Sequence, residues 1–306
     1  MAIPFDPTGA IVVGTDLSQR AGRAVEWASA RAAETGHTLQ VVLAIPEVPI
    51  PPRSHLLAAM QESDWPGHIE ELAEAKLHEV TNHVKRAHPK LAMETFLVRG
   101  VPSYTLAQAS KTAELVVIGA RGAYAPFKVR ALGGTADAVV QHAHGPVAVV
   151  TDLAEGVEGG PIVVGVDDSA EAQAALRWAA AEAATRGVRL HAVHALDLTP
   201  WLSAPLGGGA IDPVPLAEGI KDATERQVAP YREQYPELQI DVEVPTGLPE
   251  KALLHASEGA SLLVVGSRGR GGFTGLLLGS TSKAVLRDAH CPVVILRGDD
   301  RRVTPA

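Results

Sequence analysis

Residues 162–169 read IVVGVDDS and residues 11–18 read IVVGTDLS, so one eight-residue pattern occurs twice in the chain. Each copy begins with β-branched residues, which predict a buried strand. Each copy ends in Asp-x-Ser, and serine is a favoured N-cap for a following helix. A tryptophan then follows at the same distance in both copies, at Trp27 and Trp178. The chain therefore repeats a strand-to-helix unit.

The repeat continues in the same order along the rest of the chain, which indicates a duplication. The matching segments are GVP at 100–102 with GLP at 247–249, LVVIG at 115–119 with LLVVG at 262–266, and HGPV at 144–147 with HCPV at 290–293. A period near 150 residues is too long for a solenoid unit and has the size of a domain. We therefore predict two domains, residues 1–152 and 160–306, with a linker at residues 153–159.

Each half alternates short apolar runs with alanine-rich segments of helical period. Such runs fit strands buried on both faces of a parallel sheet, and their alternation with helices predicts a doubly wound fold. We expect an α/β protein with two tandem doubly wound parallel five-stranded sheets of Rossmann-like type. The expected strands are residues 10–15, 39–45, 93–98, 115–119 and 147–151, then 161–166, 188–195, 239–244, 262–266 and 293–297. The expected helices of the first half are residues 18–35, 68–87, 102–112 and 134–143.

Two kinds of segment are candidates for contacts. Long proline-rich loops at 46–52 and 199–215 follow the second strand of each half. We interpret them as variable surface loops, with cover over a site or contact with a partner as the alternative. The last strand of each half, at 147–151 and 293–297, is expected at a sheet edge, and unpaired edges invite pairing.

The bulk composition excludes several classes of protein. The 306 residues carry a formal net charge of -8, which disfavours nonspecific nucleic-acid binding because that depends on a basic surface. The single cysteine, Cys291, excludes an intramolecular disulfide and a multi-cysteine zinc site. The chain lacks a signal-peptide pattern and an apolar run of the roughly 18–20 residues that span a bilayer. We expect a cytoplasmic protein without a nucleic-acid or membrane partner.

Candidate binding residues follow the first strand of each half. In open parallel sheets, ligands bind at the carboxyl ends of strands, where the strand order reverses. Asp16 and Asp167 occupy that place, each two residues before a serine. Turn or capping chemistry is an equally good local explanation for these carboxylates.

The fourth strand of the second half leads into a dense glycine loop, GSRGRGGFTGLLLGSTSK at 266–283. Glycines allow a close approach of the backbone, and a helix beginning near Gly279 would direct its positive end at an anion. Ser280 and Thr281 add hydroxyl donors. Arg268 and Arg270 add positive charge to an otherwise acidic chain. The loop therefore predicts a phosphate site.

Other nucleotide and catalytic motifs are missing. The sequence contains no G-x-x-x-x-G-K-[ST], no G-x-G-x-x-G after either first strand, no kinase signature set and no G-x-S-x-G. The histidine pairs 142/144 and 191/194 lack a matching acidic ligand set, so we interpret them as core or surface residues. We predict neither a catalytic residue nor a metal site formed by the protein.

The glycine loop resembles a family motif. Gly266-x-x-Gly269, nine residues, then Gly279-Ser280 is similar to the G-2x-G-9x-G-[S/T] motif of ATP-binding universal stress proteins, and the duplication resembles tandem members of actinobacteria. The resemblance implies an ATP ligand accompanied by Mg²⁺. It implies that Asp167 and the backbone of Ala195 hold the nucleoside end. It implies that ribose and phosphates lie on Gly266, Gly269, Gly279 and Ser280.

The first half departs from this pattern. Asp16 and Ala44 are in place, and so are Gly119 and Gly122, but ten residues precede Gly133 where the motif has nine. The motif's Ser or Thr is replaced by Gly134, with Thr135 next. An inserted residue displaces the amides of a phosphate loop, so we expect the first half to bind ATP weakly or not at all.

The resemblance implies a regulatory role in stress or dormancy that depends on bound ATP. One alternative is a slow ATPase or autophosphorylating enzyme, although the loop contains no obvious base for hydrolysis. A second alternative is an interaction module that has lost its nucleotide. In the family, the edges of two such sheets join, so the two halves are expected to pair within one chain, with a homodimer as a further possibility.

Overall fold

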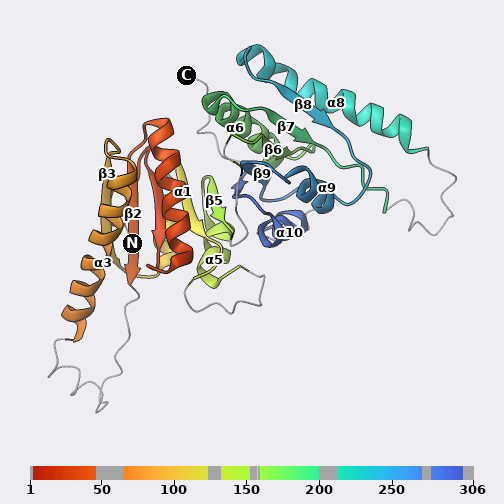
Figure 1. The fold of residues 1–306 in the computed structure, drawn as a ribbon. Helices are drawn as coiled ribbons and strands as arrows, with labels where there is room; N and C mark the ends of the chain where they lie inside the picture. Colours follow the sequence, from red (N-terminus) through yellow and green to blue (C-terminus); the bar gives the residue numbers. More distant parts are fainter. Residues whose placement is uncertain are drawn as a thin grey trace.

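The structure is a computed structural model that describes residues 3–45, 65–122, 132–151, 157, 159–199, 212–270 and 277–298. Within these ranges the chain alternates strands and helices in two halves that lie side by side (Figure 1). The expected loop at 46–52, most of the loop at 199–215 and most of the linker at 153–159 fall outside the described residues.

The first half follows the predicted alternation. Its elements are β1 (Ile11–Thr15), α1 (Gln19–Thr35), β2 (Leu39–Ile45), α3 (Trp65–Ala87), β3 (Met93–Arg99), α4 (Pro102–Ala109), β4 (Leu115–Gly119), α5 (Gly134–His142) and β5 (Val147–Val150). Helix α4 is shorter than expected, because the chain turns at Ser110, whose hydroxyl donates to the Ala107 carbonyl.

The second half repeats the order. Its elements are β6 (Ile162–Gly165), α6 (Ala170–Arg186), β7 (Leu190–Val193), α8 (Pro213–Gln234), β8 (Ile240–Glu243), α9 (Pro249–Ala256), β9 (Leu262–Gly266), α10 (Ser280–Asp288) and β10 (Val293–Leu296). Helix α8 begins inside the segment expected to be a loop, with Asp212 as its N-cap and Pro213 in its first turn. Proline suits the first turn because it has no amide hydrogen to leave unpaired.

The described strands form one sheet in the order β3-β2-β1-β4-β5-β10-β9-β6-β7-β8. Within each half the pairs are parallel, and the two halves join where β5 and β10 pair antiparallel. Strand order reverses between β1 and β4 and again between β6 and β9. These reversals confirm the doubly wound fold and mark two positions where a ligand can bind.

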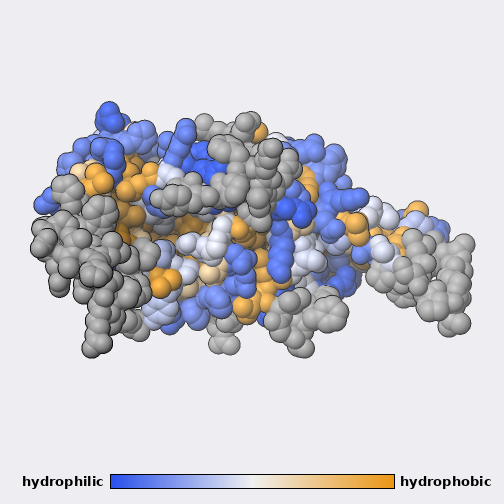
Figure 2. Space-filling view, turned by 90° about the horizontal axis from the view of Figure 1, so that it is seen from below, coloured by the Kyte–Doolittle hydropathy of each residue, from blue (hydrophilic) through white to orange (hydrophobic). Residues whose placement is uncertain are grey.

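Helices cover both faces of the sheet. On one face α1, α3, α6 and α8 pack against strand residues such as Ile11, Val13 and Ile162. On the other face α4, α5, α9 and α10 pack against Val12, Val163 and their neighbours. The strands are therefore buried on both sides, as their apolar runs predict. On the surface seen from below, polar and apolar residues are mixed (Figure 2). Among the described residues, no helix has the length and apolar character needed to cross a membrane.

The helices after β1 and β6 begin and end as their sequences indicate. The hydroxyls of Ser18 and Ser169 accept hydrogen bonds from amides three residues later, which caps each helix. Both helices end at glycines in the left-handed region, Gly36 with φ 72° and Gly187 with φ 63°. A side chain is costly in that conformation, so these two positions require glycine.

This local chemistry can be tested with matched alanine variants. A Cβ at Gly36, Gly187 or Gly22 would meet no atom within 4 Å, so only backbone conformation differs among them. We expect Gly36→Ala and Gly187→Ala each to lower the free energy of unfolding by about 1 kcal/mol. Gly22→Ala, inside α1, should raise it by about 0.5–1 kcal/mol. Urea unfolding followed by circular dichroism would measure both signs, and equal effects would contradict the assignment.

Candidate functional site

The structure brings the predicted residues of the second half together where β6 and β9 diverge. Asp167 follows β6, Gly266 ends β9, and α10 begins immediately after Gly279. The amide of Gly279 donates to the Ser267 carbonyl at 2.8 Å, which brings the start of α10 back to the end of β9. Residues 271–276 of the connecting loop lie outside the described part of the chain. The site is therefore built on the edge where a doubly wound sheet binds ligands.

Asp167 has both a local and a long-range role. Its Oδ1 accepts the Ser169 amide at 2.8 Å and the Ser169 hydroxyl, which is the turn chemistry that its sequence context allows. Its Oδ2 accepts the Arg270 amide at 3.1 Å. The carboxylate therefore holds the glycine loop against the end of β6.

Three glycines of the loop differ in what requires them. A Cβ at Gly266 would lie 2.8 Å from Glu171, and one at Gly269 would lie 2.7 Å from Asp167 Oδ2, so packing excludes side chains there. Gly279 has φ -71°, and its Cβ would have nothing closer than 3.5 Å. Neither the backbone nor the packing of the described residues requires glycine at position 279. Its missing side chain leaves the first turn of α10 open.

The first turn of α10 carries unused donors. Ser280 and Thr281 occupy the first two positions of the helix, and the Lys283 amide donates to the Gly279 carbonyl at 3.0 Å. The opening amides of a helix have no intrahelical acceptor, and the N-cap Gly279 offers no side chain to them. Ser267 is fully buried, and its hydroxyl has no hydrogen-bond partner among the described residues. This end of the helix therefore presents several polar donors.

Ser282 anchors this turn to the sheet. Its buried hydroxyl donates to the Gly266 carbonyl at 2.7 Å. The bond connects the third residue of α10 to the last residue of β9. It keeps the helix terminus directed at the end of the strand.

The two arginines of the loop contact carboxylates. Arg268 Nε donates to Glu171 Oε1 at 2.9 Å. Arg270 Nη1 donates to Asp168 Oδ2 at 2.9 Å. Both guanidinium groups are about half exposed, so the pairs lie at the rim of the site. Arg268, predicted as a phosphate contact, therefore has a protein partner in this structure.

His194 is a further residue of the site, and no motif in the sequence predicts it. Its Nε2 accepts from Arg270 Nη2 at 3.2 Å, and its Nδ1 lies 3.2 Å from the Thr224 hydroxyl. Because that hydroxyl already donates to the Ile220 carbonyl, the His194 Nδ1 is the donor in this contact and the ring is neutral. Burial, and then the Arg270 guanidinium, lower the pKa of His194, while Asp168 and Asp167 oppose the shift. Only its place next to Ala195 could have indicated this role.

Ala195, which the family resemblance assigns to the nucleoside end of the ligand, lies just beyond the end of the neighbouring strand β7 and is half-buried. The amides on either side of it are engaged: His194 donates to the Glu243 carbonyl at 3.0 Å and Leu196 to the Pro245 carbonyl at 2.9 Å. Its counterpart Ala44 lies within β2, in register with Val98 of β3. Ala195 therefore sits at the same end of the sheet as Asp167.

The first half has the same framework. Asp16 Oδ1 accepts the Ser18 amide at 3.0 Å, and a Cβ at Gly122 would lie 2.8 Å from Asp16 Oδ2. The Gly133 amide donates to the Ala120 carbonyl at 2.9 Å, as Gly279 does to Ser267. Gly133 is also the N-cap of α5, so it is the counterpart of Gly279. The extra residue of the first half therefore lies between Gly122 and Gly133.

This alignment pairs Gly134 with Ser280 and Thr135 with Thr281. Gly119, at the end of β4, corresponds to Gly266. The next positions differ in chemistry: Ala136 replaces Ser282, and Asp137 replaces Lys283. The first turn of α5 therefore contains an acidic residue, and that of α10 contains none. Negative charge at a helix N-terminus opposes the binding of an anion there.

The positions after the first aspartate also differ between the halves. Leu17 stands where the second half has Asp168, and it has φ 62°, a strained conformation for a leucine. Arg20 stands where the second half has Glu171, and its Nη1 donates to the Gly122 carbonyl at 3.2 Å. The two sites therefore share a backbone plan and differ in their side chains.

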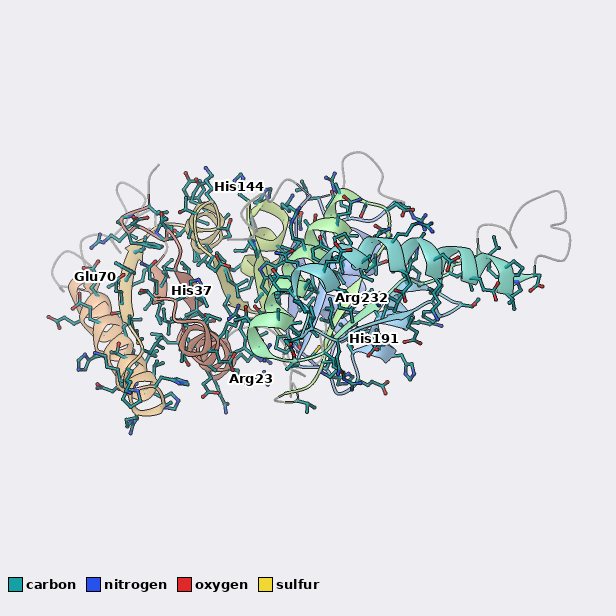
Figure 3. The ribbon with its side chains drawn as sticks, turned by 90° about the horizontal axis from the view of Figure 1, so that it is seen from above. Arg23, His37, Glu70, His144, His191 and Arg232 are labelled. Atoms are coloured by element: carbon teal, nitrogen blue, oxygen red, sulfur yellow. The ribbon has the colours of Figure 1, made fainter. Side chains whose placement is uncertain are left out.

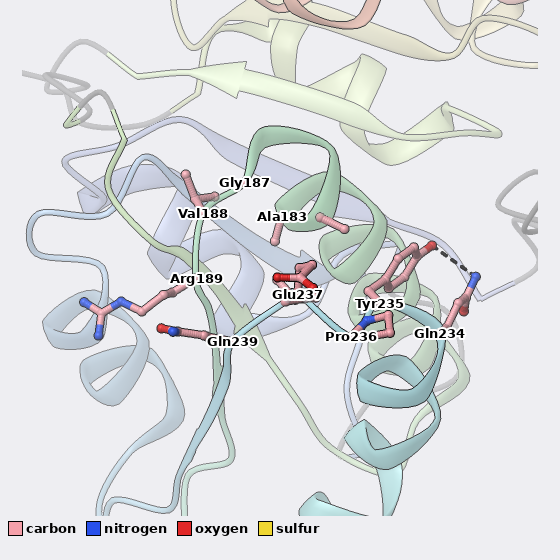
Figure 4. Close-up of a pocket in the computed structure, with 11 residues that line it drawn as sticks. Ala183, Gly187, Val188, Arg189, Gln234, Tyr235, Pro236, Glu237 and Gln239 are labelled. Atoms are coloured by element: carbon pink, nitrogen blue, oxygen red, sulfur yellow. Dashed lines mark hydrogen bonds between the residues drawn. The ribbon is translucent and has the colours of Figure 1, made fainter.

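A cavity of about 480 Å³ lies at the opposite end of the strands (Figure 4). It is lined by the end of α6, including Gly187, and by residues that precede β7 and β8, such as Arg189 and Gln239. The cavity is therefore separate from the carboxyl-end site, and none of the predicted site residues lines it.

The histidines singled out in the sequence are dispersed. His144 and His191 lie on different halves (Figure 3). His191 Nε2 lies 2.9 Å from Glu243 Oε2, and the His144 amide donates to the Ser110 hydroxyl. Within the described ranges, no three His, Cys, Asp or Glu residues are grouped so as to hold a metal ion.

Comparisons with known proteins agree with the duplication. The model of the universal stress protein family matches residues 8–151 and again residues 160–297. A universal stress protein of Mycobacterium tuberculosis is 32% identical over 320 residues, with 97% of each chain covered. One of Mycolicibacterium smegmatis is 33% identical, covering 94% of this chain and 96% of the relative. The crystal structure of a universal stress protein from Archaeoglobus fulgidus superimposes with a TM-score of 0.65 at 23% identity, covering 94% of this chain and 98% of that one.

The lowered pKa of His194 predicts a pH dependence of stability. In the unfolded chain the His194 imidazole takes up a proton near pH 6.5, and in the folded chain it does so only at lower pH. The contribution of neutral His194 to the free energy of unfolding is therefore fully present above about pH 6.5. It is lost as the pH falls through the pKa that His194 has in the folded chain. In urea unfolding, the wild type should lose more free energy between about pH 7 and pH 5 than His194→Gln, which retains a neutral acceptor. His255→Gln, at a side chain 84% exposed, serves as the control and should follow the wild type.

Proposed function

Because the chain belongs to the universal stress protein family, we propose that it binds ATP at the carboxyl ends of β6 and β9 and acts as a nucleotide-dependent regulator of a stress response. The observation that carries the proposal is the open first turn of α10. Nothing among the described residues requires glycine at position 279, and the amides after it lack acceptors in the helix. Such a turn is suited to binding an anion.

The side chains around this turn support a phosphate ligand. Ser280 and Thr281 add hydroxyl donors, and Lys283 adds positive charge in the first turns of α10. The hydroxyl of Ser267, which has no hydrogen-bond partner in the described part of the chain, is a further donor at the base of the loop. Positive charge, the helix dipole and clustered donors together favour a polyphosphate over a neutral ligand.

Two glycines of the loop serve packing within the protein. A Cβ at Gly266 would lie 2.8 Å from Glu171 and one at Gly269 would lie 2.7 Å from the Asp167 carboxylate, so these glycines bring the loop against the end of β6 and the start of α6. In our proposal, Asp167 and the backbone of Ala195 hold the nucleoside, and the loop holds ribose and phosphates. Mg²⁺ would neutralise the triphosphate and take most of its ligands from phosphate oxygens and water, as it commonly does with nucleotides.

The proposal favours binding over hydrolysis. Hydrolysis requires a group that positions or deprotonates water. Three titratable groups at the site already have partners within the protein: Asp167 with Ser169 and the loop, Glu171 with Arg268, and His194 with Arg270 and Thr224. These groups hold the loop in place, which suits a site that binds a nucleotide and transmits its presence.

We propose that the first half binds ATP more weakly. Its loop carries one extra residue, and its α5 begins with Gly134 where α10 has Ser280. Asp137 places a negative charge in the first turn of α5, where α10 has Lys283. Ala136 of α5 lacks a hydroxyl, whereas its counterpart Ser282 uses its hydroxyl to connect α10 to β9. Each difference lowers the affinity for an anion.

Two matched alanine variants test the proposed site. Gly279→Ala and Gly133→Ala change equivalent N-cap glycines, and each should cost a similar amount, about 0.5–1 kcal/mol, in helix capping. The nucleotide content of freshly purified protein, released by denaturation and separated by ion exchange, should be about one ATP per chain for the wild type and for Gly133→Ala. In Gly279→Ala the added methyl group blocks the open turn, and affinity should fall at least tenfold, about 1.4 kcal/mol. Equal occupancy of all three proteins, or no binding by any, would contradict the proposal.

The charge difference between the halves offers a second test. Lys283→Asp should weaken ATP binding by roughly 3- to 30-fold, because it replaces an attractive charge near the helix terminus with a repulsive one. Raising the salt concentration should reduce that loss, because salt screens exposed charges. Isothermal titration calorimetry at low and high salt would measure both effects. Asp137→Asn in the first half is the control and should leave the affinity of the second-half site unchanged.

A further inference from the structure

The two halves meet around a pseudo-twofold axis that can be located from repeat-equivalent residues. Strands β5 and β10 correspond through a shift of 146 residues, because Val147 matches Val293. Ala148 pairs in register with Val294, which is its own counterpart under this shift. Helices α1 and α6 correspond through a shift of 151 residues, because Asp16 matches Asp167. A residue that contacts its own counterpart lies on the axis.

Arg31 of α1 and Glu182 of α6 form such a pair, because 31 + 151 = 182. Arg31 Nη2 donates to Glu182 Oε2 across the boundary between the halves. The arginine side chain is 9% exposed and the glutamate side chain 2%. The axis therefore passes through a buried ion pair whose members are opposite in charge at equivalent positions.

Two further charged residues, Arg186 and Glu34, lie near the pair. Arg186 Nη1 lies 3.8 Å from Glu182 Oε1, and Arg186 Nε lies 3.7 Å from Glu34 Oε2. Burial raises the pKa of Glu182, while Arg31 and Arg186 oppose the increase. Arg31 Nε and Nη1 have no hydrogen-bond partner among the described residues. A buried pair this incompletely satisfied contributes little net stability, although loss of one partner is costly.

Apart from the contact between Arg186 and Glu34, the other polar contacts between the halves in the described part of the chain end on backbone atoms. The Thr151 hydroxyl donates to the Ala289 carbonyl at 3.0 Å, at the end of α10. Its counterpart Arg297 donates to the carbonyls of Val140 and Gln141, at the end of α5. The β5–β10 pairing is also made by backbone groups. Backbone acceptors exist in both halves, so these contacts do not distinguish one half from the other.

We propose that the Arg31–Glu182 pair determines which halves associate, so that a first half accepts a second half and rejects another first half. If two first halves paired in the same way, Arg31 would face Arg31. If two second halves paired, Glu182 would face Glu182. Like charges buried together cost several kcal/mol. This cost disfavours the two wrong pairings and so makes the association specific. Since the short linker holds the two halves of one chain at high effective concentration, the partner is the half of the same chain.

The test uses full-length chains with single charge reversals. Arg31→Glu and Glu182→Arg each place like charges on the axis in every possible pairing. Each variant alone should lose at least about 5 °C in the midpoint of thermal unfolding. When the two variants are mixed, every contact between different chains is complementary. Light scattering after gel filtration should then show a new species with twice the mass of either variant alone, where one chain has 32.0 kDa.

Two double variants complete the test. Arg31→Glu with Glu182→Arg in one chain restores opposite charges. This chain should recover at least half of the fall in the unfolding midpoint and should have the wild-type mass. Arg31→Met with Glu182→Leu removes both charges and should keep the midpoint, which shows that the halves still fold and pack. Single reversals that retain the wild-type midpoint, or a mixture with no new species, would overturn the proposal. A charge-restored chain that recovers less than half of the loss would also overturn it.

Discussion

The structure depends on the requirement that parallel strands, buried on both faces, be joined by helices that run from the carboxyl end of one strand back to the amino end of the next. Because all crossovers have the same hand, the chain can cover both faces only by reversing its direction of winding once in each half. The reversal separates the carboxyl ends of β1 and β4 and those of β6 and β9. Asp16, Asp167 and the glycine loops lie at these two points. The place of the site is therefore a consequence of the topology.

Much of this could be predicted from the sequence because it depends on local signals. The apolar runs that became β1 and β6, the serine caps and the terminal glycines Gly36 and Gly187 each specify structure within a few residues. Strand order also predicted that Asp167 and the glycine loop follow the carboxyl ends of strands, at the edge of the sheet where ligands bind. His194 was missed because its partners, Thr224 and Arg270, lie 30 and 76 residues away. The Arg31–Glu182 pair was missed for the same reason, since no local pattern relates residues 151 positions apart.

Duplication explains why the halves share a backbone plan and differ in side chains. The contacts that maintain the fold at each site, such as the Gly133 and Gly279 amide bonds, are kept in both halves. Differences appear where a ligand or the other half would be contacted: Asp137 occupies the position equivalent to Lys283, and Arg31 occupies the position equivalent to Glu182. A tandem chain can accept such opposite charges at equivalent positions, whereas an association of identical halves cannot.

The site and the boundary between the halves are connected by one short helix. The N-terminus of α10 opens onto the proposed phosphate site, and the carbonyl of Ala289, at its C-terminus, accepts the Thr151 hydroxyl of the first half. Ser282 also attaches the helix to the end of β9. A helix of nine residues is rigid over its length, so a displacement at one end is carried to the other. Under the proposed function, a ligand that binds more tightly to one position of α10 would change the contact between the halves, which is the physical requirement for regulation by a bound nucleotide.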